Sequence, residues 1–278
     1  MKYLLVFLHN KKAAVGICIL LFFVIVAIFA PCIAPYSPTY MGFTPLQMSS
    51  RQHLLGTTAI GQDIFSRIIW GTRLSLFVGI IIGLIATMLS VTVGLTAGYF
   101  GGLVDDILVM ITNIFLVIPG LPLMIIIAAY ITVKGTVTIV FVISITGWAW
   151  GARVLRSQAM TLKNRDFVKA SIVVGERPGH VIFSDIFPNM LSLVVANFFG
   201  VSLYAVLSEA GLEFLGLGDS SAVSWGTILY WSQNNNAMLF GLWQWMVVPG
   251  LCIALLGVSF ALINFAIDEV TNPRLRKR

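Results

Sequence analysis

The feature that most constrains this chain is a series of six long apolar segments, none of which carries a charge in its middle. Their approximate bounds are 13–34, 74–97, 107–131, 136–152, 190–210 and 245–267. Each has about 20 residues, the length that an α-helix needs to cross the hydrocarbon core of a bilayer. Only 10% of the residues are charged and the mean hydropathy is +0.96, whereas a soluble domain carries about 25% charged residues. The sequence therefore predicts an all-α integral membrane protein with six transmembrane helices.

The basic residues are distributed unevenly between the apolar segments. If the N-terminus lies in the cytoplasm, 13 of the 17 Lys and Arg residues fall on the cytoplasmic side, leaving Arg51, Arg67, Arg73 and Lys134 outside. This bias predicts that both termini are cytoplasmic. The net charge of +6 comes from short clusters without a basic stripe, so we expect no nucleic-acid partner.

We expect three regions along the chain. Residues 1–73 hold an N-terminal cytoplasmic segment, the first transmembrane helix and a long external loop. Residues 74–267 form a core of five transmembrane helices with a charged cytoplasmic loop at 153–189, and residues 268–278 form a cytoplasmic tail. The first apolar segment also resembles a signal sequence, but Pro31 before Cys32 does not suit a cleavage site, so a retained helix is favoured.

No group of residues predicts catalysis or metal binding. The chain lacks a phosphate-binding G-x-x-x-x-G-K-[ST] loop, and its three histidines and three cysteines lack metal-ligand spacing. We therefore expect no enzymatic activity and no cofactor bound by this chain. Uncharged crossings argue against a proton or ion path. However, Pro119 and Pro122 interrupt the third segment, which keeps a secondary transporter or channel as the alternative class.

The charged loop at 153–189 is predicted to form a helix, a turn and a second helix outside the membrane. Gly175 can adopt the left-handed conformation that ends a helix, and a short helix can begin near Pro178. Pro188 is expected to end this helix before the fifth crossing. The apolar residues of the loop, among them Val173 and Phe183, are too few to build a domain. Exposed apolar residues on a charged loop indicate a protein partner, which would then supply the driving force.

The loop resembles the EAA loop of the permeases of ABC importers. The resemblance rests on the run from Phe167 to Gly175 and on Pro188 and Asn189, which follow thirteen residues later. In that family the loop forms a coupling helix that inserts into a groove of the ATPase subunit. The residues that the resemblance assigns to ATPase docking are Lys169, Ala170, Ser171, Gly175, Glu176, Arg177, Pro188 and Asn189. The match is not complete, since Lys169 stands where the family usually has Glu and Ser171 replaces the second Ala.

Several further segments, in the correct order, resemble the C-type subunit of the dipeptide/oligopeptide/nickel permeases. They lie at 53–67, 71–75, 98–105, 209–218, 224–226 and 272–276. The resemblance implies the type I permease fold of ABC importers, in the inner or plasma membrane of a prokaryotic cell. It also implies a second, related permease as heterodimer partner, an extracytoplasmic substrate-binding protein, and two ATPase subunits that hold ATP and Mg²⁺.

The transported solute is less constrained. The family carries peptides, chelated nickel and, in some branches, oligosaccharides, so we expect peptides and keep oligosaccharides of the β-glucoside type or chelated nickel as alternatives. Trp225, Tyr230 and Trp231, in the last external segment, are candidates for the substrate path, since aromatic faces stack on sugar rings. An aromatic belt at the membrane interface is the competing interpretation of these residues.

Overall fold

The structure, a computed structural model, describes residues 10–271. The signature at 272–276 and most of the predicted tail lie outside the described residues. In chain order the helices are α2 (Lys11–Ile28), α3 (Ala30–Ile33), α4 (Ile64–Phe100), α5 (Gly102–Val117), α6 (Gly120–Tyr130), α7 (Thr136–Gly147), α8 (Ala149–Lys163), α9 (Asp166–Val174), α10 (Pro178–His180), the π-helix η1 (Val181–Ile186), α11 (Phe187–Phe214), α12 (Trp225–Asn234) and α13 (Gln244–Thr271). Within this part of the chain the only β contact is a bridge between Thr57 and Asp63, so the all-α prediction is confirmed.

The number of apolar crossings agrees with the predicted six when one bent helix pair is counted as a crossing. Five helical stretches of residues 10–271 are long and apolar enough to span a membrane, and α5 with α6 forms a further pair bent by 91°. The bend lies at Ile118 and Pro119. Ile118 has an extended backbone (φ −76°, ψ 127°), as expected before a proline, and Pro119 precedes the first turn of α6.

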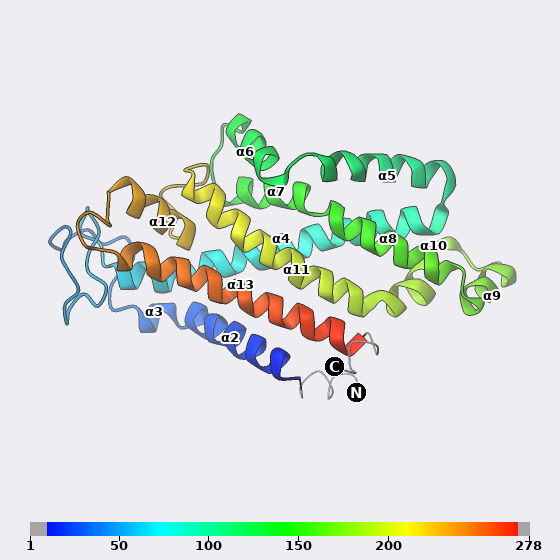
Figure 1. Cartoon of the computed structure of the whole chain (residues 1–278), viewed down its shortest axis with the longest axis horizontal. Coiled ribbons are helices and arrows are strands. Elements are labelled where there is room, and N and C mark those ends of the chain that lie inside the picture. Colours follow the sequence, from blue (N-terminus) through cyan, green and yellow to red (C-terminus); the bar gives the residue numbers. More distant parts are fainter. Residues whose placement is uncertain (1–9, 272–278) are drawn as a thin grey trace.

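Helix α4 runs through the centre of the molecule and contacts α8, α11, α2 and α7 (Figure 1). It begins ten residues before the predicted start at residue 74. Asp63 caps it by accepting a hydrogen bond from the Ser66 backbone N–H at 2.8 Å. The polar residues of its first turn, including Ser66 and Arg67, are buried against other parts of the chain. These polar residues made the segment resemble a loop in the sequence.

Two pairs of glycines on α4, each with a spacing of four residues, lie where neighbouring helices approach closely. Gly79 and Gly83 face α11, and Gly94 and Gly98 face α8. A Cβ atom added to Gly98 would lie 2.7 Å from the Cβ atom of Ala159, closer than two carbon atoms pack. The small residues therefore allow α4 to serve as the central helix of the bundle.

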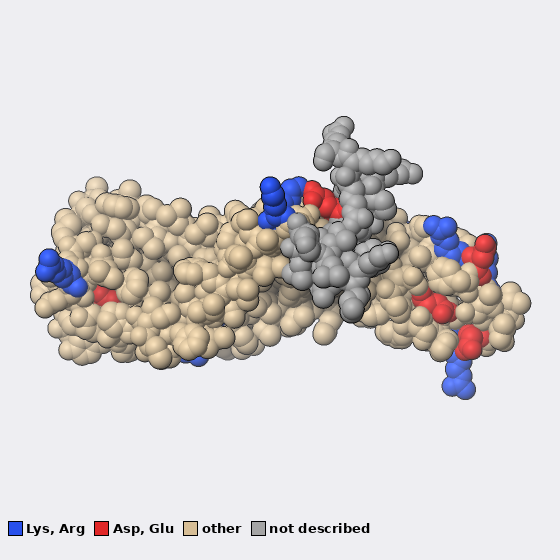
Figure 2. Space-filling view, turned by 90° about the horizontal axis from the view of Figure 1, so that it is seen from below, with Lys and Arg blue, Asp and Glu red and all other residues tan. Residues whose placement is uncertain are grey.

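The two ends of the molecule differ in structure. Helices α9 and α10 lie at one end, called here the α9 end, while α12 and the loop at 34–63 lie at the other, called the α12 end (Figure 1). On the face shown in Figure 2, charged side chains gather at the α9 end and in a second group near the middle of the length, while long stretches between them are uncharged. These uncharged stretches fit a molecule whose surface is largely covered by lipid.

Candidate functional site

The connection between α8 and α11 is a compact helical hairpin at the α9 end. Helix α9 ends at Gly175, which has the left-handed conformation (φ 89°, ψ 22°). The Gly175 N–H donates to the Ile172 carbonyl and the Glu176 N–H donates to the Ser171 carbonyl, both at 3.1 Å. This is the hydrogen-bond pattern of a Schellman motif, which closes a helix and reverses the chain. The predicted role of Gly175 as the helix end is confirmed, and α10 begins at Pro178 as expected.

One face of this hairpin is anchored to the transmembrane bundle. Val168 of α9 and Val181 and Ile186 of η1 are fully buried. They form one apolar cluster with side chains of α8 and α4, among them Leu155 and Leu95. Because protein interiors are close-packed, this cluster fixes α9 against α8 and α4.

The opposite face of the hairpin carries exposed apolar side chains. Val173 and Val174, called here the α9 tip, are 86% and 81% exposed. Their neighbours Lys169, Glu176 and Arg177 are also exposed, so the tip lies on a surface that carries charged side chains. Burial of this apolar tip against another protein would be favourable.

The fifth crossing starts with the wide turn of η1 and continues into α11 without interruption. The prediction that Pro188 ends a short helix before this crossing is wrong, because Pro188 lies in the first turn of α11, where its missing N–H group is tolerated. The Phe187 N–H donates to the Ile182 carbonyl across the π-helical turn. The Asn189 side chain donates to the Asp185 carbonyl at 2.7 Å. Pro188 and Asn189 thus shape the junction between the hairpin and α11.

Two polar contacts join α8 to α5. The Arg156 guanidinium donates to both carboxylate oxygens of Asp105 at 2.5 Å, and the Arg153 side chain donates to Asn113 Oδ1 at 2.7 Å. The side chains of Arg156 and Asp105 are 28% and 13% exposed, so the pair is partly shielded from water. The same helix that anchors α9 is therefore also tied to the helix that precedes the bend at Pro119.

A groove of about 530 Å³ opens between α5, α7, α8, α11 and α13. Its polar lining includes Asn197 and Tyr204 of α11 and Asn264 of α13. Asn264 donates to the Ala196 carbonyl at 2.9 Å. Asn197 donates to Thr87 Oγ1 at 3.3 Å. The groove was not predicted from the sequence, because no charged residue in the middle of a crossing marks it. Neutral amides inside apolar runs were the signal that would have found it.

The aromatic residues predicted for a substrate path have different environments in the structure. Trp225 is fully buried, and its indole Nε1–H donates to the Ile68 carbonyl at 3.1 Å. It belongs to the packing between α12 and α4 and touches no open space in this conformation. Tyr230 is partly buried. Trp231 is 38% exposed and lines a separate cavity at the α12 end.

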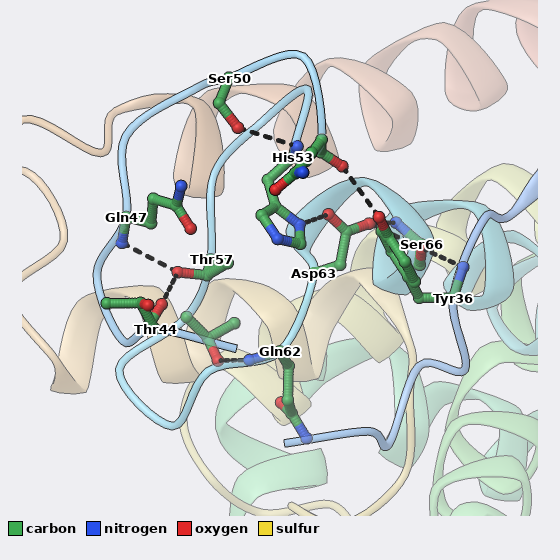
Figure 3. A network of polar contacts seen from close by, with 11 residues as sticks. Tyr36, Thr44, Gln47, Ser50, His53, Thr57, Gln62, Asp63 and Ser66 are labelled. Atoms are coloured by element: carbon green, nitrogen blue, oxygen red, sulfur yellow. Dashed lines mark hydrogen bonds and ion pairs between the residues drawn. The ribbon is translucent and has the colours of Figure 1, made fainter. Parts of the chain in front are cut away.

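The signature residues between 53 and 67 meet in a polar network inside the loop at the α12 end (Figure 3). His53 Nδ1 lies 2.9 Å from Asp63 Oδ1, and Asp63 Oδ2 accepts hydrogen bonds from the backbone N–H and the hydroxyl of Ser66. Tyr36 and Phe43 pack against the His53 ring. These contacts fix the long loop onto the start of α4, so the spacing of the signature has a structural cause.

Comparisons with known proteins agree with this architecture. Residues 90–277 match the family model described as binding-protein-dependent transport system inner membrane component, and residues 4–54 match that of the N-terminal TM domain of oligopeptide transport permease C. The oligopeptide transport system permease protein OppC of Bacillus subtilis is 32% identical over 98% of this chain and 88% of its own length. The dipeptide transport system permease protein DppC of Haemophilus influenzae is 34% identical over 98% of this chain and 93% of its own length. The protein of the same name from Bacillus subtilis is 31% identical over 96% of this chain and 83% of its own length.

Proposed function

We propose that this chain, which belongs to the family of binding-protein-dependent transport system inner membrane components, is moved by a separate ATPase that docks on the α9 tip. The chain is a multi-pass membrane protein and a non-enzymatic permease subunit of an ABC importer. Such a permease works with ATPase and substrate-binding partners. The docking site, the assembly and the cargo are the parts that we propose.

The observation that carries the docking proposal is the combination of an exposed apolar tip with a rigid attachment. Val173 and Val174 are exposed on a charged surface, while Val168, five residues before Val173, is fully buried against the bundle. A groove on the ATPase that covers the two valines would gain free energy from their burial. Closure of the ATPase dimer would then move α9, and with it α8 and α4, as one body. The Arg156–Asp105 pair extends this body to α5.

The orientation and assembly follow from the same surface. We place the α9 end in the cytoplasm, because the basic residues of the loop at 153–189 are expected on that side. Two ATPase subunits would hold ATP and Mg²⁺ there, one under this chain and one under a related permease in a heterodimer. The α12 end would then face the extracytoplasmic substrate-binding protein. Alternating access would open the path between the two permeases first to one side and then to the other.

The groove between α5, α8, α11 and α13 is our proposed half of the translocation path. The related permease would face it and enclose the rest. Asn197, Tyr204 and Asn264 would offer hydrogen bonds to a polar solute, and Thr146 and Asp268 add two further polar side chains to walls that are otherwise mostly apolar. We propose that the solute is a short peptide, because the relatives are named as oligopeptide and dipeptide permeases and amide side chains match the hydrogen-bonding groups of a peptide backbone.

Replacement of Gly175 by a bulky residue tests the docking proposal. A Cβ atom at Gly175 has no neighbour within 4 Å, so a side chain can leave the backbone there into open space, although the left-handed backbone opposes any non-glycine residue. We expect the assembled importer to lose ATP-driven peptide uptake while its ATPase subunits still hydrolyse ATP. Gly135→Trp, between α6 and α7, is the control for added bulk at an open position, and Gly101→Trp, at φ 69° with no neighbour within 4 Å, is the control for the left-handed backbone. Uptake that survives Gly175→Trp at the wild-type rate contradicts docking at this loop.

A further inference from the structure

A cavity of about 430 Å³ lies at the α12 end, between the loop at 34–63 and the segment around α12. This volume falls within the range of roughly 300–1,000 Å³ that is typical of small-molecule sites. Its lining combines large apolar side chains with polar ones, notably Met41, Ile60, Gln62, Arg67, Trp231 and Trp245. The cavity is separate from the groove between the transmembrane helices and shares none of its lining residues.

Arg67 gives the cavity its charge. The residue is only 6% exposed, and it donates through Nη1 to Gln62 Oε1 and, at 3.2 Å, to the Pro38 carbonyl. Both acceptors are neutral. Among residues 10–271, no carboxylate forms an ion pair with Arg67. A buried cation without a counter-ion is costly, so this site favours an anion that is supplied from outside the described chain.

The carboxylate nearest to Arg67 in the sequence already contacts other partners. Asp63 lies four residues earlier, and its Oδ1 contacts His53 Nδ1 at 2.9 Å (Figure 3). Its Oδ2 accepts from the backbone N–H and the hydroxyl of Ser66 at 2.8 and 2.6 Å. The network that holds the loop thus directs Asp63 away from Arg67 and leaves the guanidinium for another partner.

The unused donors of Arg67 suit a carboxylate. Within residues 10–271, Nε and Nη2 of Arg67 donate no hydrogen bond. Neither atom is fully enclosed by the protein, so both can be reached by a ligand. The edge of a guanidinium that carries Nε and Nη2 binds a carboxylate through two parallel hydrogen bonds. The rest of the cavity is largely apolar at Ile60, Trp231 and Trp245. The Trp231 Nε1–H is occupied by the Ser220 carbonyl at 2.9 Å, which leaves the ring face for an apolar group.

We propose that this cavity binds the C-terminal carboxylate of a short peptide through Arg67, with an apolar side chain of the peptide against Trp231. The proposal rests on the proposed peptide cargo and places a holding site on the side where the substrate-binding protein delivers it. Arg67 lies beneath the loop and not on its rim, so a free chain end reaches it more readily than a side chain on a docked protein surface.

The test measures peptide binding to the complete membrane complex, in lipid nanodiscs, without the substrate-binding protein. The probes are Ala-Ala-Phe and the same tripeptide with a C-terminal amide. We expect the acid to bind and the amide to bind at least about tenfold more weakly, since hydrogen bonds to a charged group are lost. Trp231→Ala is expected to weaken binding of the acid, and Arg67→Gln to abolish it. Trp243→Ala is the matched control, because Trp243 is 52% exposed and does not line the cavity.

Three results overturn the site. Equal binding of the acid and the amide would show that the C-terminal carboxylate is not recognised. An equal effect of Trp231→Ala and Trp243→Ala on peptide binding would show that the peptide does not bind in this cavity. If the free peptide does not bind, but Arg67→Gln weakens binding of the substrate-binding protein itself, the carboxylate belongs to that protein. Uptake assays separate this outcome from a failure of the proposed function. Wild-type complex that takes up no tripeptide contradicts the cargo, whereas normal uptake with an unchanged KM in Trp231→Ala contradicts the site alone.

Discussion

Truncation of the two valines of the α9 tip is expected to weaken ATPase binding without weakening the permease. Val173 and Val174 are 86% and 81% exposed, so Val173→Ala with Val174→Ala removes almost no contact within the chain. Substitutions at such exposed positions change the free energy of unfolding by about 0.5 kcal/mol or less. The thermal unfolding temperature of the purified permease complex should therefore stay near the wild-type value.

The expected loss of affinity follows from the area that docking would bury. Each substitution removes two carbon atoms, and a buried methylene group contributes about 0.8 kcal/mol. If the ATPase covers both side chains, the double variant loses about 3 kcal/mol of binding free energy, or about 100-fold in Kd. A smaller loss would indicate that only part of the tip is covered.

The assay measures binding of purified ATPase subunits to the permease complex in nanodiscs, together with ATP-driven peptide uptake. Val137→Ala is the matched control, because Val137 of α7 is 83% exposed and belongs to a different surface. Wild-type affinity in the Val173/Val174 double variant refutes the reasoning. An equal loss of affinity in Val137→Ala also refutes it, because the loss would then be nonspecific.

Three further predictions concern the body that carries the α9 tip. Gly98→Ala should destabilise the permease by about 1–3 kcal/mol through overpacking against α8. Gly211→Ala, with no neighbour within 4 Å of the added Cβ, should leave the unfolding temperature unchanged or raise it. Equal effects of the two substitutions on the unfolding temperature would contradict the close α4–α8 approach. Asp105→Asn should lower the free energy of unfolding by about 1–2 kcal/mol, between the values for exposed and buried ion pairs. A double-mutant cycle with Arg156→Ala should show coupling. Strictly additive effects would mean that the Arg156–Asp105 pair does not stabilise the permease. Gly175→Ala should lower uptake more than Gly175→Asn, because Asn tolerates the left-handed conformation better; the reverse order in the uptake assay would exclude a backbone cause.

The architecture could be predicted from the sequence, because its strongest signals are the length of the apolar runs and the position of a helix-ending glycine. A crossing needs about 20 apolar residues, and six such runs appear whatever their partners are. Gly175 was identified for the same reason, since a glycine after a helix-forming run has a preferred local conformation. The structure confirms it at φ 89°. Both features are decided locally, so one sequence suffices to find them.

Features decided by tertiary contacts were missed. Pro188 marks a helix end in an isolated peptide, yet η1 and α11 form one continuous element around it. Ser66 and Arg67 resemble loop residues, yet packing buries them at the start of α4. Trp225 was a candidate for the substrate path, yet it fills space between α12 and α4. In each case the neighbour that decides the outcome lies far away in the sequence or is itself unknown from the sequence.

The candidate site could be predicted only in part, because most of it depends on tertiary contacts. The ATPase-docking residues of the loop were assigned through a motif, and the structure adds which of them are exposed. The groove and the Arg67 cavity combine residues from distant segments, so no local pattern contains them. Asn197 and Asn264 are 67 residues apart in the sequence yet line one groove. A search for neutral polar residues within apolar runs would have found both, but not the groove that they share.

The most direct test of the docking claim is a photo-cross-linking measurement on the importer in intact cells. Val173 is replaced by p-benzoylphenylalanine, and Val137 is replaced in a parallel strain. We predict that illumination links position 173 to an ATPase subunit and that position 137 forms no such product. A product between position 173 and the substrate-binding protein, or the absence of any ATPase product, would contradict both the docking site and the orientation proposed for this permease.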